Sequence, residues 1–130
     1  MTHGYRILIV DDDADFIAAV GAYLEANGFT IVTAADGQEG VRMAAQHRPA
    51  LVIMDVMMAD RTEGLFAVNE LRRVPGLERT PIIVASALYT AEPGFTVAPD
   101  AEWLAGATFL PKPVDLSALL ERINTLLDAG

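Results

Sequence analysis

The chain has 130 residues, the length of one domain and enough to bury a single hydrophobic core. Hydrophobic residues make up 52% of it, which excludes disorder of the whole chain. The formal net charge of −9 argues against direct binding to nucleic acid, because such binding needs a basic face. The absence of cysteine excludes disulfides and thiolate metal sites. We find no signal peptide and no apolar run of the roughly 20 residues that a membrane span requires, so we expect a cytoplasmic protein without a membrane span.

Apolar segments alternate with amphipathic ones from end to end. The apolar segments predict strands at Tyr5–Val10, Thr30–Ala34, Leu51–Asp55, Ile82–Ser86 and Thr108–Leu110. The amphipathic segments predict helices at Ala14–Asn27, Gly37–Arg48, Glu63–Arg73 and Asp115–Asp128. Strands that are apolar on both faces and separated by helices indicate a parallel sheet covered on both sides. We therefore predict one α/β domain over residues 1–130.

The segment between the fourth and fifth predicted strands does not fit this alternation. A helix is expected there, but the segment contains Pro93, Gly94 and Pro99. Proline inside a helix costs about 3 kcal/mol or more. We expect a loop over residues 88–98 and a short helix over about Asp100–Leu104.

Acidic residues, a hydroxyl residue and a lysine lie at the ends of the predicted strands. Asp11, Asp12 and Asp13 follow the first strand, and Asp55 ends the third. Ser86 ends the fourth strand, and Lys112, the only lysine of the chain, follows the fifth. Parallel sheets bind ligands at the carboxyl ends of their strands. Carboxylate oxygens suit Mg²⁺, an aspartate beside a metal can act as a nucleophile, and a lysine and a hydroxyl can contact phosphoryl oxygens. The sequence thus predicts a site for Mg²⁺ and a phosphoryl group, with Asp13 a solvated acid at a helix start.

Four segments together resemble the receiver domain of two-component response regulators, over nearly the full length. They are Ile7–Asp13 with its acidic end, Pro49–Met58 around Asp55, Pro81–Ala87 ending in a hydroxyl residue, and Gly106–Pro113 with an aromatic residue and the lysine. The resemblance implies a flavodoxin-like, doubly wound sheet of five parallel strands in the order 2-1-3-4-5 with helices on both faces. The fourth helix would be short or disrupted here.

The resemblance also implies roles for single residues. Asp55 accepts the phosphoryl group from a histidine kinase or a phosphotransfer protein, and Lys112 pairs with the phosphoryl oxygens. The ligands of Mg²⁺ are Asp11, Asp12, Asp55 and the backbone carbonyl of Met57. Ser86 and Phe109 move when the domain is phosphorylated. The output is contact with a downstream protein, without turnover of external substrates.

The sequence departs from the family pattern in two places. The usual proline after Met58 is Ala59, and Gly64 comes about one residue late, which leaves the start of the third helix open. The disrupted fourth crossover leaves open whether the usual partner surface and dimer exist, because the fourth helix, fifth strand and fifth helix form that surface in the family.

Other classes of function remain as alternatives. The chain could be a receiver cut from a longer response regulator or hybrid histidine kinase, or a degenerate interaction module that is not phosphorylated. An aspartyl-phosphate hydrolase would need a second acid, which acts as general acid, two residues after Asp55. This chain has Met57 at that position. A flavin or nucleotide carrier would want a glycine- and hydroxyl-rich loop after the first strand, where this chain has three acids.

Overall fold

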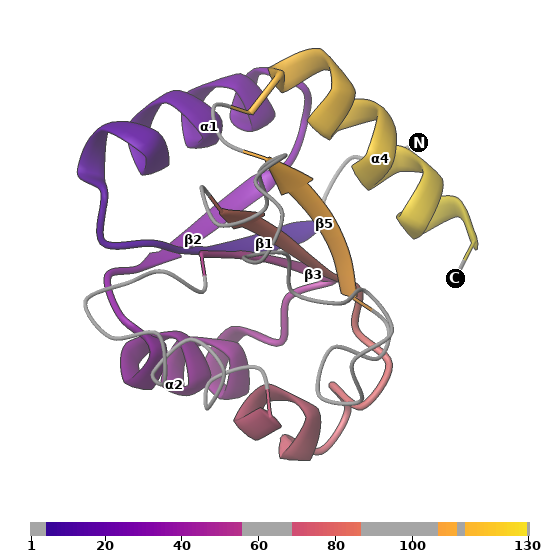
Figure 1. The fold of residues 1–130 in the computed structure, drawn as a ribbon. Coiled ribbons are helices and arrows are strands. Elements are labelled where there is room, and N and C mark those ends of the chain that lie inside the picture. Colours follow the sequence, from indigo (N-terminus) through magenta and orange to yellow (C-terminus); the bar gives the residue numbers. More distant parts are fainter. Residues whose placement is uncertain (1–4, 56–68, 87–106, 112–113, 130) are drawn as a thin grey trace, which may run out of the picture.

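Five parallel strands form one sheet in the order β2-β1-β3-β4-β5 (Figure 1). The computed structural model describes residues 5–55, 69–86, 107–111 and 114–129. The strands are β1 (Arg6–Val10), β2 (Thr30–Ala34), β3 (Leu51–Met54), β4 (Ile82–Ser86) and β5 (Ala107–Pro111). The helices labelled in Figure 1 are α1 (Ala14–Ala26), α2 (Gly37–His47) and α4 (Leu116–Ala129), and residues 69–73 are helical as well. The predicted strand order is confirmed.

The sheet separates two hydrophobic layers. On one face α1 and α4 lie together, as Figure 1 shows, and Val20, Leu24, Leu119 and Ile123 pack on alternate strand residues. On the other face α2 and the segment around Leu71 pack on the strand residues between them. Each inner strand is therefore buried on both faces, which is why its sequence is continuously apolar.

Aspartates begin each helix whose first turn is described. Asp13 precedes α1 and accepts hydrogen bonds from the backbone amides of Asp15 and Phe16. Asp36 caps α2 by accepting a hydrogen bond from the amide of Glu39. Asp115 accepts from the amides of Ser117 and Ala118 at the start of α4. Such caps satisfy amides that have no partner inside the helix, so these starts are fixed by local sequence.

One glycine permits the close packing of α2 on the sheet. A Cβ atom at Gly40 would lie 2.9 Å from one γ-methyl carbon of Val10 and 3.0 Å from the other. No larger residue fits there without a shift of the helix. Because Val10 is the last residue of β1, this contact fixes the approach of α2 to the end of the strand that leads into the acidic loop.

The observed ends of these elements differ from the predicted ones by at most one residue. The predicted start of β1 at Tyr5 moves to Arg6, and the predicted end of α2 at Arg48 moves to His47. Arg48 has a left-handed backbone with φ of 47° and ends the helix before Pro49. The predicted start of the third helix and the predicted loop and short helix between β4 and β5 lie outside the described residues. Within the described residues, no helix is both long and apolar enough to cross a membrane.

Candidate functional site

The ends of β1 and β3 lie next to each other in the sheet. Val10 pairs with Met54 in the register of these strands, so Asp11 and Asp55 each follow the last paired residue. The amide of Asp55 donates to the carbonyl of Val10 at 3.1 Å, and the amide of Asp11 donates to the carbonyl of Ala34 on β2 at 3.0 Å. Backbone hydrogen bonds therefore hold both aspartates at the carboxyl edge of the sheet.

Three carboxylates gather at this edge. One oxygen from each of Asp11, Asp12 and Asp55 can be chosen so that all three lie within 4.8 Å of one another. Asp11 is 1% exposed and Asp55 is 7% exposed, whereas Asp12 is open to solvent. Negative charges at such distances repel, and partial burial strengthens the repulsion. A divalent cation that takes oxygen ligands would remove it, so the donor set fits Mg²⁺.

The loop that carries Asp12 is anchored on both sides. The amide of Asp13 donates to Oδ1 of Asp11 at 2.9 Å. The Asp13 side chain in turn accepts from the amides of Asp15 and Phe16 at 3.0 and 3.2 Å. Asp13 thus has a capping role that the sequence did not predict, although its place just before a helix and its residue type are the pattern of a helix cap.

The other predicted site residues are described only in part. Ser86 is the last residue of β4 and pairs with Pro111 of β5, so its backbone lies at the same edge as the acidic cluster. Phe109 pairs with Val84 in the middle of β5. Their side chains lie outside the described part of the structure, and so do Met57 and Lys112. The structure therefore brings the carboxylates of Asp11, Asp12 and Asp55 together, and the side chains of the other predicted site residues lie outside its described part.

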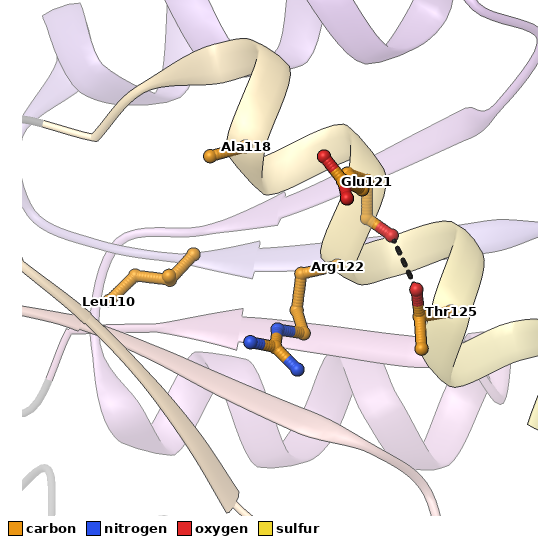
Figure 2. Close-up of a pocket in the computed structure, with 5 residues that line it drawn as sticks. All are labelled: Leu110, Ala118, Glu121, Arg122 and Thr125. Carbon is orange, nitrogen blue, oxygen red and sulfur yellow. Dashed lines mark hydrogen bonds between the residues drawn. The ribbon is translucent and has the colours of Figure 1, made fainter.

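Among the described residues, two pockets lie beside α4, and the lining of neither includes Asp11, Asp12 or Asp55. One, of about 290 Å³, lies between β5 and α4 and is shown in Figure 2; it is lined by Leu110, Ala118, Glu121, Arg122 and Thr125. Within it the Thr125 hydroxyl donates to the backbone carbonyl of Glu121 at 3.0 Å. The other, of about 370 Å³, is lined by Asp13, Asp15, Phe16, Ala19, Val20, Val114 and Leu116. The sequence predicted neither set.

Comparison with known families and sequences places these features in context. The response regulator receiver domain matches residues 7–124. The transcriptional regulatory protein PrrA of Mycobacterium tuberculosis is 34% identical over 123 residues, which are 94% of this chain and 49% of PrrA. GlrR of Escherichia coli K12, also a transcriptional regulatory protein, is 34% identical over 124 residues, or 95% of this chain and 26% of GlrR. The chain thus spans half or less of the length of these curated relatives.

Solved structures give the same result for the fold. A CheY-like response regulator receiver domain protein from Methanospirillum hungatei superposes with a TM-score of 0.80 at 28% identity, covering 96% of this chain and 94% of that one. The signal receiver domain of a histidine kinase from Syntrophus aciditrophicus superposes with a TM-score of 0.81 at 28% identity, covering 97% and 92%.

Proposed function

The chain belongs to the response regulator receiver domain family of two-component, phosphorylation-dependent signalling, and on that premise we propose that Asp55 accepts a phosphoryl group from a histidine kinase or a phosphotransfer protein. The observation that carries this proposal is the position of Asp55. It follows β3 directly, it is almost buried, and two further carboxylates lie beside it. A carboxylate in such a position is a suitable nucleophile for phosphorus once its neighbours are neutralised.

The proposed reaction exchanges one bond for another. A carboxylate oxygen of Asp55 attacks phosphorus, and the bond between phosphorus and the imidazole nitrogen of the donor histidine breaks. The electron pair of that bond stays on the imidazole, and Asp55 becomes an acyl phosphate. The β1 and β3 backbone holds Asp55 in place through the bond from its amide to the carbonyl of Val10, so the nucleophile needs little reorganisation.

The proposed Mg²⁺ ligands are the carboxylates of Asp11, Asp12 and Asp55 and the backbone carbonyl of Met57. When bound, Mg²⁺ neutralises negative charge on the carboxylates and on the phosphoryl oxygens. We assign Lys112 to another phosphoryl oxygen, because its place after β5 puts it near the edge where Ser86 ends β4. Ser86 and Phe109 are the proposed switch residues. The roles of Met57, Lys112, Ser86 and Phe109 follow from the resemblance to the receiver family, since their side chains lie outside the described residues.

The proposed output is contact with a downstream protein, and we propose no turnover of external substrates. Residues 1–130 would form one receiver domain. PrrA and GlrR are longer transcriptional regulatory proteins. That extra length supports a second candidate, in which this chain is the receiver part of a longer regulator and its target is an attached domain.

The test is intact-mass spectrometry after incubation with Mg²⁺ and acetyl phosphate, a small donor that replaces the kinase. We expect the wild-type protein to gain one phosphoryl group and Asp55→Asn to gain none. Asp36→Asn is the matched control, because it removes one negative charge at the cap of α2, outside the cluster, and should leave the gain unchanged. Equal gain in Asp55→Asn, or none in the wild type, would contradict the proposal.

A further inference from the structure

Asp13 connects the acidic cluster to α1 through two sets of hydrogen bonds. Its side chain accepts from the first-turn amides of Asp15 and Phe16, and its own amide donates to Oδ1 of Asp11. Asp11 is tied in turn to β2 through the carbonyl of Ala34. The three-residue loop is therefore fixed at its strand end and at its helix end.

Asp12 lies between these two anchors, and its carboxylate is the exposed one of the cluster. The side chain of an exposed residue is placed mainly by its backbone. A change of backbone angle at Asp13 would therefore move Asp12 and would also release the hydrogen bond that orients the carboxylate of Asp11. Both effects would separate oxygens that must lie close together to hold one cation.

We propose that Asp13 is a positioning residue for the cation site: its cap on α1 holds Asp11 and Asp12 in the arrangement that binds Mg²⁺. Asp13 is assigned this role rather than that of a ligand because its carboxylate is not part of the three-carboxylate group. This inference rests on the proposed function, since it concerns the same cation.

The negative charge of Asp13 could by itself increase the affinity for Mg²⁺, without any positioning role. Any nearby carboxylate raises the local concentration of Mg²⁺. Asp15 offers a matched measure of that effect, because it is also exposed and lies two residues further along the chain. Asp115 offers a matched measure of cap loss, because it accepts the same pair of first-turn amides at the start of α4.

The experiment is isothermal titration of the full chain with Mg²⁺ at about 0.15 M salt, where exposed charges beyond about 8 Å are largely screened. We expect Asp13→Ala to raise the Kd about fivefold, the loss that one helix cap represents. Asp13→Asn keeps an oxygen acceptor for both amides, so we expect it to match Asp15→Ala. Asp15→Ala and Asp115→Ala should each change the Kd less than about twofold.

Two further measurements distinguish a loss of positioning at the cation site from a general loss of folding or of the nucleophile. Thermal unfolding followed by circular dichroism fixes a temperature at which every variant is folded, and the titrations are made there. The initial rate of phosphorylation by acetyl phosphate should recover to the wild-type value in Asp13→Ala at saturating Mg²⁺, because the nucleophile is intact.

The possible results lead to different conclusions. A Kd for Asp13→Ala equal to that of Asp15→Ala, or an equal loss in Asp13→Asn and Asp13→Ala, would overturn the positioning role and leave the proposed function standing. Failure of the wild-type protein to bind Mg²⁺ would overturn the cation site itself, and the positioning role with it.

Discussion

The charged side chains at the two edges of the sheet have different surroundings. At the carboxyl edge, Asp11, Asp12 and Asp55 bring like charges within 4.8 Å. At the amino edge, arginines contact backbone carbonyls. Arg6, at the start of β1, donates to the carbonyl of His47 at the end of α2. Arg72 donates to the carbonyls of Leu77 and Thr80 in the turn that leads to β4.

This comparison distinguishes charged side chains that stabilise the fold from charged side chains that could bind a ligand. Burial lowers the pKa of the half-buried Arg72 guanidinium from its ordinary value, so its placement costs some solvation. Carbonyl acceptors offset that cost. The three carboxylates of the cluster repel one another, so a bound cation should stabilise the fold. Charges at the amino edge are thus explained by folding alone, whereas those at the carboxyl edge are not.

The largest expected effect is stabilisation by Mg²⁺ at the carboxyl edge. At a concentration 100 times its Kd, Mg²⁺ should raise the free energy of unfolding by about 2.7 kcal/mol, because it binds only the folded state. Urea denaturation with and without Mg²⁺ measures this. Asp12→Asn should remove most of the stabilisation and should unfold no more easily than the wild type without Mg²⁺. Equal stabilisation of Asp12→Asn and the wild type would show that the cluster does not bind the ion.

The next effect concerns Arg72 at the amino edge. Arg72→Ala should lower the free energy of unfolding by about 1–3 kcal/mol, because it removes the guanidinium donor to the carbonyl of Thr80. Arg73→Ala is the matched control. Arg73 is exposed and forms a 3.6 Å ion pair with Glu70 on the surface, so its loss should cost less than about 1 kcal/mol. Neither variant should change the affinity for Mg²⁺. Equal losses in the two variants would contradict the role given to Arg72.

The smallest effect is a pH dependence at the same edge. The pKa of Glu78 is lowered from 4.5, first by a hydrogen bond from its own backbone amide and then by one from the amide of Gly76. The fold therefore favours the ionised carboxylate. This contribution is fully present above the unfolded pKa, near 4.5, and is lost as pH falls through the lower folded pKa.

Carboxyl-carbon NMR titration of the folded protein checks the direction of the Glu78 shift. Glu78→Gln should lose less stability on acidification below pH 4.5 than the wild type does. Glu25→Gln, at an exposed position on α1, is the matched control for the loss of one negative charge. A folded pKa of Glu78 at or above 4.5 would contradict the prediction.

Elements with strong local signals were predicted almost to the residue. The bounds of β2 and β4 agree with the structure, and α1 and α2 begin at the predicted residues. The errors fall at ends where a single backbone conformation decides. Arg48 adopts a left-handed φ that glycine usually provides, so its residue type gave no signal that α2 ends before it. Asp115 was expected inside the last helix and instead caps it.

The acidic cluster was also predictable, but the connections that hold it were not. Aspartates directly after apolar runs identified Asp11, Asp12 and Asp55, because strand ends are readable from hydrophobicity. The hydrogen bond from the amide of Asp13 to Asp11 depends on the path of the loop between strand and helix. The pairing of Arg72 with a carbonyl eight residues later depends on the shape of a turn. Side-chain type alone specifies neither.

By itself, the sequence determined which segments are strands and helices, where most helices begin, and which residue types end each strand. These properties depend on neighbours within a few residues, so local hydrophobic spacing and capping decide them. The strand order, with β1 between β2 and β3, was expected only from the family resemblance. The tertiary structure establishes that order and brings Asp11 and Asp55, distant in the chain, within reach of one cation. Strand pairing is settled by burying whole faces against helices from elsewhere in the chain, and no local stretch of sequence contains that information.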